Sequence, residues 1–380
     1  MMKARISKCD TYDKDRVEEL MMLALDDAEY DFSGKVVLIK ANLVSAMSPD
    51  KAATTHPVVV GAVAKALFKK GAKRVIIGDS PGNMYTKGVL AQNYKITGMQ
   101  DAAEDSGAEL NWDFGEQEVD IPEGISAKKL HIIDAFINAD AVVNCCKLKT
   151  HALTGFSGAT KNYYGLIPGL IKAQLHATNP DMTRFSNLLV DIQEYAKSKT
   201  VLHVIDGIVG MDGEGPTAGN PKQIGVLISS KCPYSADIVA IETTLGKPEE
   251  IPYLNRALER GLIDSYKVDK IGSDINEVIV KDFRRVPLKD NLFALKNIPA
   301  FLSKQIEKGL VRYPIIPKKL CKGCGKCATH CPVQAIKVEN KVAVIDYDAC
   351  IKCFCCQELC PFHIVKIKKP LLYRLVNMLK

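Results

Sequence analysis

The strongest constraint on this chain is a cysteine motif that occurs twice near its C-terminal end. Both copies have the pattern C-x2-C-x2-C-x3-C-P, and each cysteine of the first copy recurs 29 residues later in the second. Three thiolates on one short loop can each ligate one iron of a [4Fe–4S] cubane, and the fourth iron then takes a cysteine from the other copy. The spacing therefore predicts two clusters with exchanged fourth ligands: Cys321, Cys324, Cys327 and Cys360 for the first, and Cys350, Cys353, Cys356 and Cys331 for the second.

A pair of zinc sites is the alternative interpretation of these cysteines. Structural zinc usually takes two C-x2-C pairs separated by a longer spacer, and a duplicated quartet ending in Cys-Pro does not match that pattern. The arrangement resembles the bacterial two-cluster ferredoxin module over residues 318–369, which implies a small α+β domain with two 4Fe-4S clusters. Cys355 lies inside the second motif but outside its spacing, and we expect it to fill space rather than ligate iron.

The distribution of cysteine also bears on the compartment. Nine of the 13 cysteines lie between Cys321 and Cys360 of a 380-residue chain, whereas disulfide scaffolds belong to short secreted chains. No apolar stretch follows the first charged residues, and no apolar run approaches the ~20 residues that cross a bilayer. We therefore expect a cytoplasmic protein with no membrane span.

The formal net charge of +7 raises the question of nucleic-acid binding. Residues 318–369 contain ten lysines and four acidic residues, a net charge of +6 for that segment. Two oxidised clusters with their eight thiolates carry about −4, so these lysines largely balance the clusters. Because no nucleic-acid recognition motif accompanies the charge, we expect no nucleic-acid partner.

The first 310 residues alternate short apolar runs with amphipathic stretches. We expect strands at 36–39, 74–77, 141–145, 201–205 and 224–228, and helices at about 56–70, 186–197 and 236–245. This alternation predicts an α/β domain with a largely parallel sheet and helices on both faces. Further along the chain we expect a strand at 277–281, a proline-containing linker at 311–317, the cluster domain at 318–369 and a helical tail at 370–380.

Polar residues cluster where the predicted strands end. Ligands of parallel sheets bind beyond the carboxyl ends of the strands, and several cations there would suit an anionic substrate and proton transfer. The chain has no phosphate-binding loop or dinucleotide fingerprint. For the glycine-rich stretch 210–219, an anion site and a plain flexible loop remain equal alternatives. The candidate catalytic residues are Lys147, Lys149, His151, Lys161 and Asn162, and the candidate cofactor-binding residues are Asp79, Ser80, Asp206, Gly213, Glu214 and Gly215.

Neighbouring ammonium groups repel one another unless an anion or a carboxylate lies between them. We therefore expect an empty site to hold its lysines in internal ion pairs, with Asp79, Asp206, Glu214 and Asp237 as the available partners.

Three segments resemble the "domain of unknown function 362" family: residues 147–151, 161–168 and 206–216. Residues 55–57 and 78–80 fit the family as well, and the resemblance covers about residues 35–245. Several members carry a C-terminal ferredoxin module, so the resemblance implies this two-part architecture. It implies few residue roles, because the activity of the family is not generally established. Cys145-Cys146 departs from the apolar residue and proline expected before the lysines.

Two functions are compatible with the sequence. The first is a ferredoxin-linked redox enzyme that passes electrons from the clusters to an anionic substrate or cofactor in the α/β domain. The second is a non-catalytic electron carrier or assembly factor that serves a partner enzyme. Both require a redox partner protein as electron donor or acceptor.

Overall fold

The computed structural model describes residues 2–286 and 311–370. The chain divides into two compact units, Met1–Val286 and Pro287–Lys380. The tail expected at 370–380 lies outside the described residues from position 371 onward.

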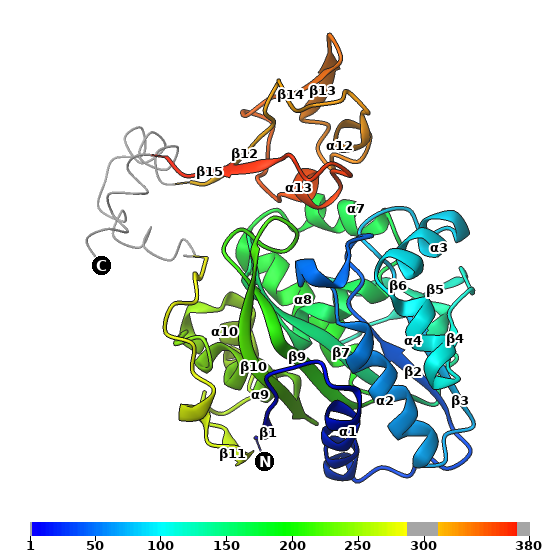
Figure 1. The fold of residues 1–380 in the computed structure, drawn as a ribbon. Coiled ribbons are helices and arrows are strands. Elements are labelled where there is room, and N and C mark those ends of the chain that lie inside the picture. The colour runs from blue at the N-terminus through cyan, green and yellow to red at the C-terminus, as the bar shows by residue number, and fades with distance from the viewer. Residues whose placement is uncertain (1, 287–310, 371–380) are drawn as a thin grey trace. The chain divides into compact units, whose positions relative to one another are not determined.

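The larger unit is built on a nine-stranded sheet with the order β11-β1-β10-β9-β7-β2-β3-β4, and β8 pairs with β7 (Figure 1). Neighbours from β9 to β4 run parallel, whereas β10 is antiparallel to both β9 and β1. This confirms the largely parallel α/β sheet. Its strands are β1 (Lys3–Lys8), β2 (Val36–Lys40), β3 (Arg74–Gly78), β4 (Glu109–Leu110), β7 (Ala141–His151), β8 (Gly155–Ser157), β9 (Thr200–Asp212), β10 (Asn220–Ser230) and β11 (Asp269–Gly272).

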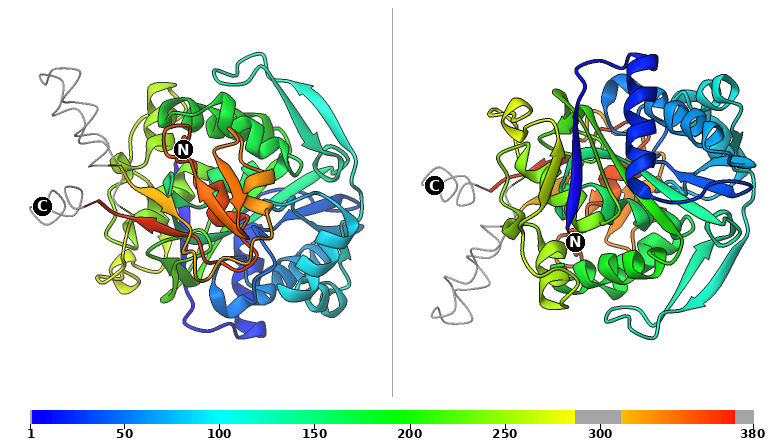
Figure 2. Two further views of the ribbon diagram at one scale, coloured as in Figure 1. Left: turned by 90° about the horizontal axis from the view of Figure 1, so that it is seen from above. Right: turned by 90° about the horizontal axis from the view of Figure 1, so that it is seen from below.

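Helices cover both faces of the sheet, as Figure 2 shows. One face carries α1 (Lys14–Ala28), α2 (Pro57–Lys69), α3 (Lys87–Ile96) and α4 (Met99–Ser106). The other carries α5 (Asp134–Ile137), α6 (Ala159–Asn162), α8 (Met182–Ala196), α9 (Pro233–Glu242) and α10 (Pro252–Glu259), with α7 (Ile171–Thr178) at its margin. The remaining elements are the hairpin β5 (Glu116–Asp120) and β6 (Lys129–Ile133), and the 3-10 turns Pro49–Lys51, Tyr163–Leu166, Pro248–Glu250 and Ile275–Glu277.

The register of the central strands decides which face each polar side chain meets. Residues paired across parallel strands share a face, so Lys40, Asn144 and His203 lie on the α6/α8 face. Lys147 pairs with Asp206, and both lie with Cys145 on the α1/α2 face. Because side chains alternate along a strand, the two lysines on β7 at positions 147 and 149 point the same way.

Several boundaries differ from those expected from the sequence. Strands β7, β9 and β10 are longer than predicted, and β7 continues through the polar residues Lys147–His151 because that end of the strand is buried. Strand β1 was not predicted. The prediction of a strand at 277–281 is wrong. A 3-10 turn lies at Ile275–Glu277, and the strand of this region is β11, which pairs with β1.

Within residues 311–370, the smaller unit has two antiparallel pairs of strands and two short helices. Strand β12 (Tyr313–Ile315) pairs with β15 (Lys366–Lys368), and β13 (Ile336–Glu339) pairs with β14 (Val342–Ile345). Helices α12 (Lys326–Thr329) and α13 (Cys355–Glu358) each follow a cysteine loop. Residues 313–315 were expected in a linker, yet they form β12. Pro314 is tolerated there because a strand of a two-stranded ribbon has one free edge.

Candidate functional site

Lys147, in the carboxyl-terminal half of β7, and Asp206, in the middle of β9, form a buried ion pair. Lys147 Nζ lies 2.8 Å from Asp206 Oδ2, and neither side chain is exposed. Lys147 Nζ also donates to the Tyr12 hydroxyl at 2.9 Å, and that hydroxyl donates to Asp206 Oδ1 at 3.0 Å. Burial lowers the pKa of Lys147, although the Asp206 carboxylate opposes this shift. The pair agrees with the expectation that internal carboxylates hold the lysines.

Tyr12 and His56, which both contact Asp206, stack on each other. Tyr12 and His56 stack with ring centroids 3.5 Å apart and an interplanar angle of 10°. The His56 backbone N–H donates to Asp206 Oδ2 at 2.9 Å, while His56 Nδ1 accepts from Val58 N at the start of α2. Burial lowers the pKa of His56 to about 4, so the stacked imidazole is neutral at pH 7. Tyr12 and His56 were not among the predicted site residues.

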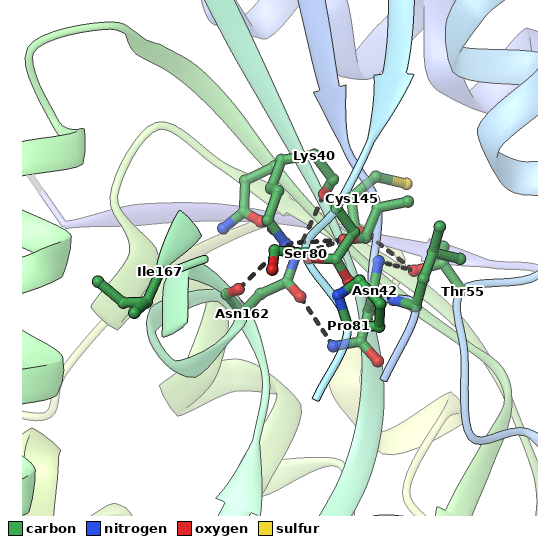
Figure 3. Close-up of polar contacts among 12 residues, drawn as sticks. Lys40, Asn42, Thr55, Ser80, Pro81, Cys145, Asn162 and Ile167 are labelled. Atoms are coloured by element: carbon green, nitrogen blue, oxygen red, sulfur yellow. Dashed lines mark hydrogen bonds and ion pairs between the residues drawn. The ribbon is translucent and has the colours of Figure 1, made fainter. Parts of the chain in front are cut away.

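Asn42 links the two faces of the sheet (Figure 3). Lys149 Nζ donates to Asn42 Oδ1 at 2.7 Å and to the Ala53 carbonyl at 2.6 Å. The other end of the same amide, Asn42 Nδ2, donates to Asn162 Oδ1 at 2.8 Å, as the close-up shows. Thr55 fixes this loop, because its hydroxyl donates to the Cys145 carbonyl and accepts from Asn42 N. The predicted residues Lys149 and Asn162 are therefore joined through a residue that the prediction left out.

A second buried ion pair lies on the α6 side of this bridge. Lys40 Nζ is 2.6 Å from Asp79 Oδ1 and also donates to the Asn162 carbonyl at 3.2 Å. Asp79 Oδ2 accepts from Leu43 N at 2.6 Å, which fixes the loop after β2. Gly165 leaves room for the pair, since a Cβ there would lie 2.2 Å from Asp79 Oδ1. Asp79 was expected to bind a cofactor, and in the structure it balances Lys40.

Ser80 accepts a hydrogen bond from another buried lysine, Lys172. Lys172 Nζ, from α7, donates to Ser80 Oγ at 3.0 Å and to the Pro81 carbonyl at 3.2 Å. Gly169 N also donates to Ser80 Oγ, at 2.9 Å. Ser80 thus anchors the segment 165–172 to the loop after β3.

The glycine-rich loop connects β9 to β10 and packs on the end of β7. A Cβ at Gly215 would lie 2.1 Å from the Thr150 carbonyl oxygen, and Gly213 has a φ of +77°. The Gly215 carbonyl accepts from Ala152 N at 2.9 Å. Close backbone contact with β7 and a left-handed turn account for both glycines. Glu214 is half-buried in the same loop.

The other predicted residues lie around this end of β7. His151 is buried, and its Nδ1 accepts from Leu153 N at 3.1 Å, so a neutral ring carries its proton on Nε2. Lys161 is half-buried on α6, with its Nζ 5.5 Å from the Tyr164 ring centroid. The structure thus divides the predicted set between two faces, with Lys147, Lys149 and His151 on one and Lys161 and Asn162 on the other.

Two loops at this edge contain three buried hydroxyls that meet no hydrogen-bond partner among the described residues. They belong to Ser45 and Thr54, in the loop after β2, and Thr217, in the loop after β9. A buried polar atom without a partner costs about 1–3 kcal/mol. A polar ligand or ordered water at this edge would remove that cost.

The adjacent cysteines of β7 are packing residues. Both Cys145 and Cys146 are buried, and they point to opposite faces of the sheet. Burial raises the pKa of each thiol, which leaves both protonated and poorly nucleophilic.

A groove of about 370 Å³ lies on the outer side of the helices that cover the α1/α2 face. Its floor includes Gly61 and Ala62 of α2, and its rim includes Lys65, Asp101 and Asp105. None of the predicted site residues lines it, so this groove and the polar cluster at the strand ends are separate features.

Cysteines of the two motifs lie close to one another in the smaller unit. One cavity is lined by Cys350, Cys353 and Cys356 of the second motif together with Cys331 of the first. In the other group, Cys327 has Cys360, Cys324 and Cys321 as electrostatic neighbours. A cubane needs one thiolate at each of four irons, and this cavity holds the four cysteines predicted for the second cluster together with Cys355.

A zinc site is the alternative interpretation of these cysteines. A tetrahedral zinc ion needs its four ligands about 2.3 Å from one point. In the described ranges, no group of three or more His, Cys, Asp or Glu side chains is arranged to hold one metal ion. Cys355 is buried at the start of α13 and lines the cavity of the second set.

The predicted site left out several residues of the polar cluster at the strand ends. Lys40 and Asn42 directly follow an expected strand, which was the available signal. Tyr12 and Lys172 gave no signal, because their contacts with Asp206 and Ser80 join segments far apart in the chain.

Across the described part of the chain, every helix is too short or too polar to cross a bilayer.

Comparison with known proteins agrees with both units. Residues 37–242 match the family described as "Domain of unknown function (DUF362)", and residues 313–361 match a "4Fe-4S dicluster domain". A thylakoid-associated protein from Synechocystis sp. is 30% identical over 241 residues, which are 60% of this chain and 69% of that protein. An uncharacterized ferredoxin from Methanocaldococcus jannaschii is 38% identical over 56 residues, 14% of this chain and 90% of that protein.

Among solved structures, the lactate racemase apoprotein from Thermoanaerobacterium thermosaccharolyticum aligns with a TM-score of 0.41 and 14% identity. The alignment covers 63% of this chain and 57% of that one, and a likeness at this level says nothing about function. The matches to the two domains confirm the expected architecture and support iron–sulfur electron transfer. The chain belongs to the DUF362 family and carries a C-terminal 4Fe-4S dicluster domain.

Proposed function

We propose that this protein is a redox enzyme whose two [4Fe–4S] clusters pass electrons to an anionic substrate or cofactor at the carboxyl ends of β2, β3, β7 and β9. The clusters supply single electrons. The first is assigned to Cys321, Cys324, Cys327 and Cys360, and the second to Cys350, Cys353, Cys356 and Cys331. A redox partner protein exchanges electrons with them.

The observation that carries the proposal is the pair of buried salt bridges, Lys40–Asp79 and Lys147–Asp206, at one edge of the sheet. Burying an ion pair costs several kcal/mol of desolvation per ion, and apolar residues of similar size often give equal or greater stability. A fold that needed only stability would gain little from two such pairs. Groups of this kind cluster at functional sites, where an incoming ligand can replace one of the partners.

The residues around these pairs have distinct roles in the proposal. Lys147, Lys149 and Lys161 attract the anion, and Asn42 and Asn162 orient it by hydrogen bonds. His151 supplies or accepts a proton through Nε2. Ser45, Thr54 and Thr217 provide hydroxyls that lack partners among the described residues. Asp79 and Asp206 hold the lysines when no anion is bound.

The test is to reduce the protein anaerobically and add small anionic metabolites without any partner protein. A redox enzyme reoxidises its clusters under these conditions, and mass spectrometry of the anaerobically purified protein should identify a retained anion. Lys161→Ala should lower reoxidation and retention at least tenfold while cluster absorption is unchanged. Lys73→Ala is the matched control, because Lys73 is exposed and precedes β3 at the opposite end of the sheet.

The second candidate is an electron carrier or assembly factor without its own substrate. The fact that favours it is that Lys147, Lys149 and Lys172 already have protein partners at hydrogen-bond distance. Such a protein would reoxidise only when a partner enzyme is present, so the same experiment separates the two functions.

A further inference from the structure

The two cysteine loops of the smaller unit differ in charge. Residues 318–327, which contain the first three cysteines, have four lysines and no acidic residue, and all four lysines are exposed. Residues 346–360, around the second motif, have one lysine and three of the four acidic residues of the segment 318–369. The lysines of the first loop are Lys318, Lys319, Lys322 and Lys326, and the acids of the second are Asp346, Asp348 and Glu358.

The fold adds a fifth lysine to the first loop. The β13–β14 hairpin lies against this loop, because Ala343 N of β14 donates to Cys321 Sγ at 3.4 Å. A Cβ at Gly323 would lie 2.6 Å from the Lys341 carbonyl oxygen, and Lys341 is exposed in that turn. Figure 1 shows the β13–β14 hairpin beside α12, which begins at Lys326. We call Lys318, Lys319, Lys322, Lys326 and Lys341 the first-loop patch.

The patch surrounds the most accessible cysteine of the two motifs. Cys324 is exposed, whereas the other seven motif cysteines are half-buried or buried. Electron transfer between proteins slows steeply with distance, so the cluster assigned to Cys324 is the better placed of the two to exchange electrons with another protein.

Charge balance alone does not explain the patch. Both predicted clusters have the same iron–sulfur core and four thiolates, so both need similar neutralisation. The second loop nevertheless carries Lys352 and three acids. The positive charge is therefore concentrated around one cluster, as a docking surface requires.

We propose that the first-loop patch docks an acidic electron-carrier protein, which exchanges single electrons with the cluster held by Cys321, Cys324, Cys327 and Cys360. This proposal rests on the proposed function, since it needs reducible clusters. In the delivery step the reduced carrier loses one electron and the first cluster gains it, and no bond is made or broken. Complementary charge raises association rates by roughly 10–10³-fold at low salt, an effect that salt screens.

The test is stopped-flow mixing of oxidised, cluster-loaded full-length protein with a reduced acidic flavodoxin, whose flavin absorbance reports the transfer. The charge-reversal variant is Lys322→Glu/Lys326→Glu. Its matched control, Lys366→Glu/Lys368→Glu, changes the net charge equally at exposed positions of β15. Reduction by dithionite, a small molecule, measures the clusters independently of docking.

The proposal predicts that the second-order rate constant falls as salt is added. At low salt, the rate constant of the first-loop variant should be at least tenfold below that of the unmodified protein, and that of the control should change less than twofold. Dithionite should reduce all three proteins equally. Equal slowing in both variants, or a rate independent of salt, would overturn the docking proposal while leaving the redox function intact. Absence of any dithionite-reducible cluster would instead overturn the proposed function itself.

Discussion

Lys147 Nζ lies 2.8 Å from Asp206 Oδ2 in a pair from which solvent is excluded, and Tyr12 bonds to both partners. Lys147→Met would leave the carboxylate buried without its cation, so we expect a loss of about 3–5 kcal/mol in the free energy of unfolding. The double variant Lys147→Met/Asp206→Asn should lose less than the sum of the two single changes. Denaturant unfolding measures all three. Arg74→Ala is the control, because its pair with Glu109 is about half exposed and exposed ion pairs add little to stability.

The buried imidazole of His203 makes stability depend on pH. Burial lowers the pKa of His203 to about 3, and Asn144 Nδ2 lies 2.9 Å from its Nδ1. The unfolded chain takes up this proton near pH 6.5, whereas the folded one does not until about pH 3. Stability from this group is therefore complete above pH 6.5 and falls below it, by at most about 1.4 kcal/mol per pH unit.

A difference measurement isolates this contribution, because burial raises the pKa of Asp237 to about 6 and its effect has the opposite sign. Between pH 7.5 and pH 5, the free energy of unfolding should fall further in the unmodified protein than in the His203→Gln variant. A constant difference between the two across that range would mean that His203 is protonated in the folded protein.

The apolar pattern predicted the centre of the fold better than its edges. Strands β2 and β3 and helix α2 were expected within one or two residues of their observed bounds, because each is a continuous apolar or amphipathic run. Strands β1 and β11 lie at the sheet margin and are only partly apolar, which explains why neither was recognised. The strand ends at Lys147–His151 and at Asp212 contain polar yet buried residues, so the apolar pattern ended before the strands did.

The candidate site was only partly predictable for a related reason. Lysines after expected strands indicated the correct edge of the sheet, but which face each side chain meets depends on register. Lys149 and Asn162 meet only through Asn42, and Lys147 meets Tyr12 from a segment 135 residues away. Such contacts are set by the tertiary fold and leave no local sequence pattern.

Gly165→Ala tests the second buried pair. The added Cβ would lie 2.2 Å from Asp79 Oδ1 and 2.6 Å from Lys40 Nζ, so the pair must separate or the loop must move. We expect a loss of about 2–4 kcal/mol in thermal or denaturant unfolding, together with lower anion retention. Gly88→Ala is the matched control, since nothing lies within 4 Å of its new Cβ. If Gly165→Ala leaves the free energy of unfolding unchanged, the Lys40–Asp79 contact is dispensable for stability.

Cys360→Ser tests the exchange of ligands between the two motifs. The variant should lose or alter the cluster assigned to Cys321, Cys324 and Cys327, despite the distance in sequence, because Cys360 supplies the fourth thiolate. Electron paramagnetic resonance of the reduced protein should then show one intact cluster in place of two interacting ones. Cys232→Ser, in the larger unit, should leave both signals unchanged. Damage restricted to the cluster of Cys350, Cys353 and Cys356 would show that each motif ligates its own cluster.

The metal and sulfide content of the anaerobically purified full-length protein tests the central claim most directly. Two [4Fe–4S] clusters predict about eight irons and about eight inorganic sulfides per chain, with no zinc. They also predict a brown colour that dithionite bleaches. About two zinc ions per chain, with neither iron nor sulfide, would contradict the claim that this protein transfers electrons.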